Sequence, residues 1–258
     1  MNNCYYYKKI VFDDPLFKNI PTSILLTMHN SKREKQYLEQ IMKFKPTRTV
    51  LIQINQGYKN CHKPDWVNST VSDLWHANIT AFEHVNFEGP LLVLEDDVEF
   101  TDYIYTYARE IDKFITSKEF DIYSLGSVPK LNELTLNKYH IRMFAGGMTQ
   151  AVIFSTHGMN IFKDVKINQP HDEYIYGKGK SFLSRKPCAI QSFEMTDNFK
   201  FWAGGSSLNL LYFQIFGKQF FHIHHNAICV GGVWILFFII ILLIIIITYQ
   251  KKLFRKYK

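Results

Sequence analysis

Apolar and polar positions alternate along this chain in short blocks that predict strands separated by helices. Between the apolar runs, hydrophobic residues recur every three or four positions, which predicts helices at 31–44, 69–84 and 101–117. Strand, helix and strand within about thirty residues indicate βαβ units and a parallel sheet. We therefore predict an α/β fold with helices flanking the sheet. The apolar runs that read as strands lie at 23–28, 49–55, 91–94, 120–126, 150–154 and 186–191.

Three stretches lack this regular pattern. Residues 1–20 show no clear period, and we expect an N-terminal extension there. The polar residues 127–145 predict a mobile connection that is long enough to be functional. Residues 177–180, Gly-Lys-Gly-Lys, predict a flexible basic loop. The remaining pattern places one domain at 21–205.

The most apolar segment of the chain lies near its C-terminus. Ala227 to Ile247 is a run of 21 uncharged, apolar residues, which as a helix spans about 31 Å and matches the hydrocarbon core of a bilayer. We predict one C-terminal transmembrane helix at 227–249. The apolar and aromatic residues before it, 206–226, predict an amphipathic juxtamembrane segment, and the basic tail 250–258 suits lipid headgroups.

Two features of the sequence give opposite orientations for that helix. The positive-inside rule keeps the basic tail in the cytosol and sends the large domain across the membrane. The first thirty residues, however, contain no apolar run typical of a signal peptide. The sequons at Asn68 and Asn78 mark a lumenal domain only if they are glycosylated. We expect a single-pass membrane protein whose large domain faces the cytosol.

Composition excludes some classes of protein. The chain has 258 residues, enough for one sizeable core. Its formal charge is +7, but the last eight residues contribute five of these units. The folded part is therefore near neutral, so we expect no nucleic-acid partner. The four cysteines are widely spaced, which predicts neither a disulfide framework nor a structural zinc site.

An acidic cluster follows the buried run Leu91 to Leu94. Glu95, Asp96 and Asp97 are adjacent, and Glu99 follows them. Neighbouring carboxylates repel one another, and a bound divalent cation relieves that repulsion, so the cluster indicates a metal site at a strand end. The alternative is an acidic turn that caps the helix beginning near Thr101, because acidic residues favour a helix N-terminus.

A second acidic element lies at 169–173, Gln-Pro-His-Asp-Glu. The ordinary interpretation is a helix that starts at the proline with acidic residues in its first turn. The basic loop 177–180 follows it directly, and Arg185 lies a few residues further along the chain.

The order of these elements resembles that of family 25 glycosyltransferases, the lipooligosaccharide-type and procollagen galactosyltransferase group, across residues 22–192. The resemblance implies a GT-A fold, a Rossmann-type mixed sheet flanked by helices. Two departures are visible: the family's Ser-Arg after its first strand corresponds to residues 30–33, and its Cys-x-x-Ser-His on the next helix is replaced by residues 70–75. The matching segments are LLVLEDDVEF, FDIYSLG, AGGMTQAVIFSTHG, PHDEY and KPCAIQ.

The resemblance also implies roles for single residues. Glu95-Asp96-Asp97 corresponds to the acidic motif that holds Mn²⁺ or Mg²⁺ against the nucleotide diphosphate, with Asp97 and Glu95 as metal ligands and Glu95 and Asp96 contacting the donor. Asp172 corresponds to the general base that deprotonates an acceptor hydroxyl, with Glu173 as its substitute. The cations expected to meet the diphosphate are Lys178, Lys180 and Arg185.

These inferences predict a membrane-anchored, metal-dependent glycosyltransferase that moves a hexose from a nucleotide sugar to a glycan, lipid or protein hydroxyl. The competing prediction is a catalytically inactive glycosyltransferase-like domain that acts as a membrane-tethered binding or structural protein. A metal-dependent phosphohydrolase also uses clustered carboxylates, but it needs a second His-Asp set that the sequence does not show at suitable spacing.

Overall fold

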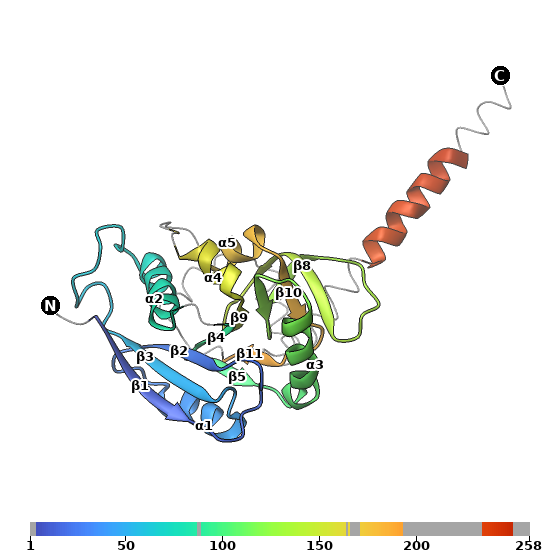
Figure 1. Ribbon diagram of the computed structural model, residues 1–258. Helices are drawn as coiled ribbons and strands as arrows, with labels where there is room; N and C mark the ends of the chain where they lie inside the picture. The colour runs from blue at the N-terminus through green and yellow to red at the C-terminus, as the bar shows by residue number, and fades with distance from the viewer. Residues whose placement is uncertain (1–3, 87–88, 164, 166–170, 193–233, 250–258) are drawn as a thin grey trace.

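The structure is a computed structural model that describes residues 4–86, 89–163, 165, 171–192 and 234–249. It has a mixed α/β architecture in which one large sheet is flanked by helices (Figure 1). The sheet has nine strands in the order β1-β3-β2-β4-β9-β6-β10-β8-β7. These strands are β1 (Tyr5–Val11), β2 (Thr22–Met28), β3 (Thr49–Asn55), β4 (Leu91–Glu95), β6 (Ile122–Ser124), β7 (Val128–Asn132), β8 (His140–Gly147), β9 (Ala151–Phe154) and β10 (Ser181–Ser184).

The large sheet is mixed, with two sets of parallel strands separated by the antiparallel strand β9. β2 pairs in parallel with β3 on one side and with β4 on the other. β9 runs antiparallel between β4 and β6, and β6 pairs in parallel with β10. β4, β6 and β10 therefore point in the same direction. A small second sheet pairs β5 (Val98–Phe100) with β11 (Ala189–Gln191).

Helices cover both faces of the large sheet. α1 (Glu34–Phe44) and α3 (Tyr103–Ser117) contribute buried residues to one hydrophobic core. α2 (Thr70–His84), α4 (Thr156–Phe162) and α5 (His171–Lys178) contribute to a second core on the other face. Figure 1 shows α1 below the sheet and α2, α4 and α5 above it. This three-layer arrangement follows from strands that are apolar on both sides.

Most of the predicted elements are confirmed within one or two residues. β3 has the predicted bounds, and α2 begins after Ser69, whose side chain accepts from Ser72 N in a capping box. Ser155 caps α4 by accepting from Gly158 N. For both helices, a serine directly precedes the helical pattern of hydrophobic residues, so the sequence itself indicates where the helix begins.

Three segments differ from the prediction. The connection expected at 127–145 is the β7–β8 hairpin. The stretch 1–20 contains β1, which extends the sheet antiparallel to β3. Of the basic loop expected at 177–180, Gly177 and Lys178 are instead the last residues of α5, and β10 follows Lys180 at once. β1 and the β7–β8 hairpin lie at the two edges of the large sheet, where polar residues face solvent and weaken the apolar signal, whereas β10 is a short interior strand between β6 and β8.

The C-terminal prediction is only partly covered by the structure. Residues 206–226, 227–233 and 250–258 lie outside the described part of the chain. Residues 234–249 are helical, and their large apolar side chains are exposed beyond Trp234. Within the described residues, no helix has both the length and the apolar character needed to cross a membrane.

One disulfide corrects the cysteine prediction. Cys4 is bonded to Cys61 across a separation of 57 residues, with Cα atoms 5.6 Å apart. The pairing arises because β1 runs antiparallel to β3, which sets Tyr5 opposite Asn55. Cys4, just before β1, therefore lies beside the loop that follows β3. A single sequence does not show this contact, because it depends on an edge strand that has no clear hydrophobic pattern.

Candidate functional site

The acidic cluster lies where the chain changes direction across the sheet. From β2 the chain passes to β3 on one side, and later to β4 on the other, so the carboxyl ends of β2 and β4 meet at a switch point. α1 and α2, which follow β2 and β3, cover opposite faces. Open α/β sheets bind ligands outside the strand ends at such a point. Glu95 ends β4 there, and Asp96 and Asp97 form the turn into β5.

Asp96, the middle acid, is held by the turn that follows β2. Its Oδ1 accepts from Arg33 Nη1 at 2.8 Å. Its Oδ2 accepts from the hydroxyls of Thr27 and Ser31, each at 2.8 Å. These contacts come from residues more than sixty positions away and fix the acidic turn against the start of α1. Asp96 is thus a positioning residue in this structure.

Glu95 and Asp97 project from the same turn toward other partners. Glu95 Oε1 accepts from Thr149 Oγ1 at 2.6 Å. Asp97 Oδ2 accepts from Gln191 Nε2 at 2.6 Å, and the main-chain oxygen of Asp97 accepts from Ser192 N. Thr149 precedes β9 and Gln191 ends β11, so three separate segments meet at the acidic turn.

Asp97 is the most deeply buried of the four acids, with 3% of its surface exposed. Its Oδ1 is buried and makes no hydrogen bond to any residue that the structure describes. Burial raises the pKa of Asp97 to about 6, although Gln191 and Arg33 oppose the shift. A buried carboxylate oxygen without a donor is unusual, because it forfeits its hydration without compensation.

Two further oxygen atoms near this turn share that property. Gln150 Oε1 and Ser192 Oγ are buried and have no hydrogen-bond partner within the described chain. The main-chain oxygen of Gln150 accepts from Glu95 N, and Ser192 N donates to Asp97 O, so both residues border the acidic turn. Three buried oxygen atoms at or beside the acidic turn are thus without a hydrogen-bond partner among the described residues.

The carboxylates do not converge as a group of three. Glu99 lies beyond the turn on β5, where its Oε1 accepts from Gln36 Nε2 at 2.9 Å. Among the residues that the structure describes, no set of three or more His, Cys, Asp or Glu side chains is placed to hold a metal ion. Within the described part of the chain, the acids at this turn therefore offer a cation fewer than three converging side chains.

Backbone strain occurs on both sides of the acidic turn. Asn30, in the turn after β2, has φ of 59°, and Met148, just before Thr149, has φ of 71°. Left-handed backbone is unfavourable for residues with a side chain, particularly for one as large as methionine. Tyr176 on α5 donates from its hydroxyl to Met148 O at 2.8 Å, which helps to hold this conformation. Strained residues often adjoin functional sites.

The second acidic element forms the start of α5, as its proline and acids suggest. Asp172 and Glu173 lie in the first turn, but their side chains are outside the described part of the structure. His171 beside them is fully buried against Trp75 of α2, with ring centroids 4.4 Å apart. Through His171 and Tyr176, α5 contacts both α2 and the strained segment next to the acidic turn.

Two of the three predicted diphosphate cations, Lys180 and Arg185, have partners away from the acidic turn. Lys180 precedes β10 beside Asp121, at the opposite end of the strand from the carboxyl edge, and forms an ion pair with Glu119. Lys178 is exposed, with its Nζ 5.6 Å from the Tyr174 ring centroid. Arg185 lies at the carboxyl edge, but its guanidinium donates to the carbonyls of Thr135 and Asn137. Lys180 and Arg185 are thus engaged with partners other than the acidic turn.

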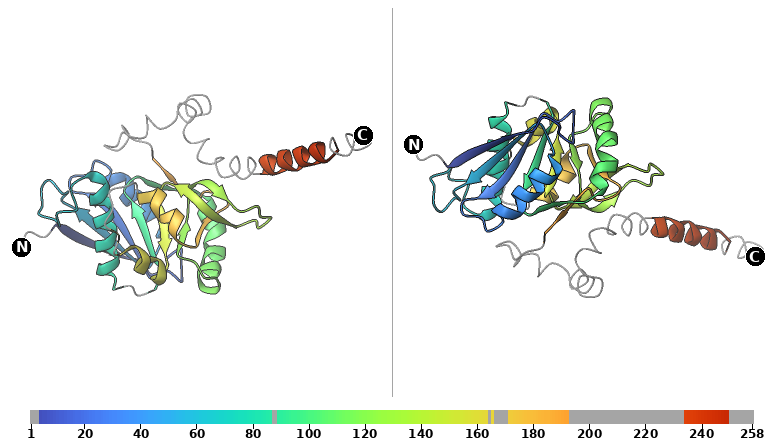
Figure 2. Two further views of the ribbon diagram at one scale, coloured as in Figure 1. Left: turned by 90° about the horizontal axis from the view of Figure 1, so that it is seen from above. Right: turned by 90° about the horizontal axis from the view of Figure 1, so that it is seen from below.

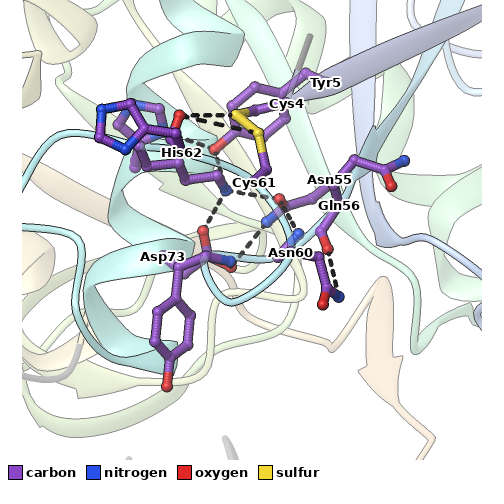
Figure 3. The surroundings of a disulfide bond; sticks show 12 residues. Cys4, Tyr5, Asn55, Gln56, Asn60, Cys61, His62 and Asp73 are labelled. Carbon is purple, nitrogen blue, oxygen red and sulfur yellow. Dashed lines mark hydrogen bonds and ion pairs between the residues drawn. A yellow bond between two sulfur atoms is a disulfide. The ribbon is translucent and has the colours of Figure 1, made fainter. Parts of the chain in front are cut away.

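A buried ion pair lies on the other side of β2. Lys63 and Asp73 form an ion pair with side chains 1% and 7% exposed, and Lys63 also donates to Asn55 Oδ1 at 2.6 Å. Burial lowers the pKa of Lys63, and Asp73 opposes that shift. Figure 3 shows Asn55 and Asp73 grouped next to the Cys4–Cys61 bond. Because His29 N donates to Asn55 O, this cluster is continuous with the turn after β2.

The residues that sequence reasoning missed are those that fix the acids: Thr27, Ser31, Arg33, Thr149 and Gln191. Ser31 and Arg33 carried a weak signal, because the family resemblance places a Ser-Arg pair after the first strand. Thr149 and Gln191 carried none.

A cavity of about 430 Å³ lies at the amino-terminal ends of β2, β3 and β4. Thr22, Thr49 and Leu91 are among the residues that line it, and it is separate from the acidic turn.

Comparisons with known proteins do not assign the chain to a family. No family model matches it, and no curated protein matches its sequence. The resemblance to family 25 glycosyltransferases therefore stays a prediction.

Several solved structures share features of the fold. A crystal structure of A197 from STIV aligns with a TM-score of 0.40 at 11% identity, over 68% of this chain and 87% of that one. A glycosyltransferase involved in glycosylation of the major capsid of PBCV-1 aligns with a TM-score of 0.33 at 11% identity, over 55% of this chain and 64% of that one. HddC from Yersinia pseudotuberculosis aligns with a TM-score of 0.35 at 13% identity, over 66% and 72%. At these TM-scores the likenesses support no functional assignment, so function is inferred from the residues of this chain.

Proposed function

We propose that this chain is a metal-dependent glycosyltransferase that moves a hexose from a nucleotide sugar to a hydroxyl group of a glycan, lipid or protein. The observation that carries the proposal is Asp97 Oδ1, a buried carboxylate oxygen without a donor among the described residues. It lies at the end of the switch-point strand, where open α/β sheets bind ligands. The predicted resemblance to the GT-A acidic motif supports the same role.

The residues at the acidic turn fit Mn²⁺ or Mg²⁺. Both ions take oxygen ligands, and Mg²⁺ usually combines one or two carboxylates with waters and substrate phosphates. Asp97 is the proposed direct ligand, and Glu95 is the second candidate. When bound, the ion would offset the charge that develops on the leaving diphosphate.

The turn after β2 gives the site its rigidity. Thr27, Ser31 and Arg33 neutralise and orient Asp96, so the acidic turn keeps one geometry before the donor arrives. A preorganised site avoids rearrangement of charged groups during the reaction. Asp96 in this proposal positions the turn and does not itself contact the metal.

Asp172 is the proposed general base, with Glu173 as its substitute. A carboxylate in this role accepts the proton of the acceptor hydroxyl as that oxygen attacks the sugar carbon. Both residues begin α5, and α5 is tied to the segment beside Glu95 through the bond from Tyr176 to Met148. Lys180 and Arg185 have partners elsewhere, so the proposal does not use them.

We further propose single-pass membrane attachment through residues 227–249. The 21 uncharged residues from Ala227 support it. From the sequence we expect the large domain to face the cytosol. The Cys4–Cys61 bond supports the opposite orientation, because disulfides persist mainly in oxidising compartments.

A thermal-shift titration of the full chain tests the proposed site. Mn²⁺ together with UDP or GDP should raise the unfolding temperature, since a ligand at about 100 times its Kd stabilises by roughly 2.7 kcal/mol. Asp97→Asn should abolish this shift, whereas Glu99→Gln, on a carboxylate already bound to Gln36, should leave it intact. Hydrolysis of nucleotide sugars by the wild type then identifies the donor. Absence of any shift with every nucleotide and metal would favour the inactive binding domain instead.

A further inference from the structure

The tip of the β7–β8 hairpin displays apolar side chains to solvent. Leu136 is 91% exposed, the highest value among the large hydrophobic residues of the described chain. Four such side chains are exposed on the hairpin, two in the turn and one on each strand, and we call them the apolar tip. They are Leu131, Leu134, Leu136 and Phe144.

Hydrogen bonds hold this tip in one conformation. Arg185 donates from Nε to Asn137 O and from Nη2 to Thr135 O, both at 2.7 Å. Asn137 Oδ1 accepts from the main-chain nitrogens of Tyr139 and His140 at 2.9 and 3.0 Å. The leucines are thus presented by an ordered turn, and their exposure is not that of an unstructured loop.

α3 braces the same turn from the side of the domain. The hydroxyl of Tyr107 donates to Lys138 O at 3.1 Å, and the rings of Tyr107 and Tyr139 meet edge to face with centroids 5.4 Å apart. A chain that keeps leucine exposed on a braced turn forgoes the stabilisation that burial of the side chain would give. An apolar surface of this kind marks a site of interaction.

Cationic side chains flank the apolar tip. Lys138 lies two residues after Leu136, and Arg142 lies on β8 with its guanidinium 5.2 Å from the Phe144 ring centroid. Arg185 and Lys186 extend from the neighbouring β10 end. The acid at this tip is Glu133, whose Oε1 accepts from Arg142 N. The described tip is therefore both apolar and net positive.

The tip lies at the end of the sheet where the carboxyl ends of β4, β6 and β10 are found. Arg185 N donates to Tyr139 O, so the turn lies beyond the carboxyl end of β10. β10 and β4 run in the same direction, which places the acidic turn at the same sheet edge. Figures 1 and 2 show the hairpin and the helical residues 234–249 on the same side of the molecule.

We propose that the apolar tip inserts into the surface of a bilayer that contains anionic lipid. Leucine and phenylalanine enter the acyl boundary, and Lys138, Arg142 and Lys186 meet the headgroups, the division of roles found in interfacial membrane-binding segments. The contact turns the sheet edge that carries Glu95 and Asp97 toward the membrane. The inference rests on the proposed membrane attachment and on the expected cytosol-facing orientation, because the anionic lipids that attract basic residues lie in the cytoplasmic leaflet.

Charge favours a bilayer over a second copy of this chain. Two apolar tips brought together would also bring together their flanking cations, whose repulsion opposes the contact. An anionic leaflet attracts the same cations and concentrates the protein at its surface. The two occupants differ in their response to lipid composition, which an experiment can measure.

A spin label on the tip tests the contact in the full chain. The chain with Cys229→Ser and Leu136→Cys is labelled and reconstituted in vesicles of phosphatidylcholine with about one third phosphatidylserine. Cys4 and Cys61 are bonded and Cys188 is buried, so these residues do not compete for label. A matched control carries the label at Lys35, an exposed position on α1. Power saturation compares access by oxygen, which dissolves in lipid, with access by a water-soluble nickel complex.

The label at position 136 should favour oxygen severalfold over the nickel complex, and the label at position 35 should not. Arg142→Gln should reduce this preference, as should vesicles without phosphatidylserine. If the chain floats with the vesicles but oxygen and the nickel complex reach positions 136 and 35 equally, the inference is overturned and the proposed membrane attachment is not. A second outcome also overturns the inference: the spectrum at position 136 shows spin–spin broadening, the nickel complex is excluded, and neither effect depends on lipid composition. This result would show contact between two copies of the chain. Failure to float contradicts the attachment itself.

Discussion

The guanidinium of Arg33 lies 2.8 Å from the carboxylate of Asp96 and joins the turn after β2 to the turn after β4. Both side chains are mostly buried, at 16% and 14% exposure. The pair fixes the spacing between two strand ends that border the switch point. Because Asp97 directly follows Asp96, the same ion pair also sets where the proposed metal ligand lies.

Arg33→Met should lower the free energy of unfolding by about 1–3 kcal/mol, because it leaves Asp96 partly buried without its charged donor. Loss of the nearby positive charge should also disfavour the ionised form of Asp97, since Arg33 opposes the rise in the Asp97 pKa. Chemical denaturation of the variant, followed by titration with Mn²⁺ and UDP, measures both effects.

The double variant Arg33→Met with Asp96→Asn provides the control for this prediction. It removes the unpaired charge, so it should recover part of the stability that the single variant loses. Purely additive effects of the two substitutions would show that the ion pair does not couple the two turns.

The sequence predicted the parallel strands β2, β3 and β4 and the helices between them, because each of these elements has its own local hydrophobic pattern. The apolar run 49–55 and the capped helix after Ser69 each carry their own boundaries. β1 was missed because polar residues interrupt it and its partner β3 is remote in sequence. The β7–β8 hairpin pairs neighbouring strands, but its polar residues hid the apolar signal. Pairing between distant strands is set by the whole sheet, and no window of sequence contains it.

The candidate site shows the same division. The sequence shows the acids at 95–97 as a cluster, but it does not show that each acid has different hydrogen-bond partners. Asp96 turns to Arg33, and Asp97 is buried beside Gln191. The partners of Asp97 and Asp96 lie 94 and 63 positions away respectively. Lys180 appeared suitable because of its position after the second acidic element, yet β10 places it at the opposite strand end.

Lys63→Met should destabilise the fold strongly. The substitution keeps the length of the side chain but leaves the Asp73 carboxylate buried beside Asn55 without its cation, a change that typically removes about 3–5 kcal/mol. Urea denaturation measures the loss. Lys63→Met combined with Asp73→Asn should be more stable than Lys63→Met alone, and a double variant that is less stable would contradict the assignment of the loss to the unpaired carboxylate.

Removal of the Cys4–Cys61 bond should also lower stability. The bond closes a loop of 57 residues, for which loss of chain entropy in the unfolded state amounts to about 2–4 kcal/mol. Cys4→Ser with Cys61→Ser should therefore unfold at lower denaturant than the wild type, and the wild type in reductant should match it. Equal midpoints for the oxidised wild type and the double variant would refute this.

The same bond reports the side of the membrane on which the domain lies. If the domain faces an oxidising compartment, Cys4 and Cys61 should resist a thiol-blocking reagent added to intact cells before lysis, and should react only after reduction. Peptide mass measurement distinguishes the two states. Direct labelling of both residues would instead support the cytosol-facing orientation.

Two buried histidines make the fold sensitive to acid. Burial lowers the pKa of His171 to about 3 and that of His140 to about 4. His171 lies against Trp75, and the ring of His140 shares a hydrogen bond with Tyr123. Between these values and about 6.5, the unfolded chain binds protons that the folded chain does not. Stability is therefore fully present above about pH 6.5 and falls as the pH decreases.

His171→Phe should flatten this dependence. Phenylalanine keeps an aromatic ring against Trp75 but does not titrate. For the wild type, His171 alone should remove about 2 kcal/mol of stability between pH 7 and pH 5, since each unit of pKa shift corresponds to about 1.4 kcal/mol. Denaturation midpoints at several pH values measure the slope, with His62→Gln, at an exposed histidine, as control. Parallel slopes for the wild type and His171→Phe would show that His171 is not the group that resists protonation in the fold.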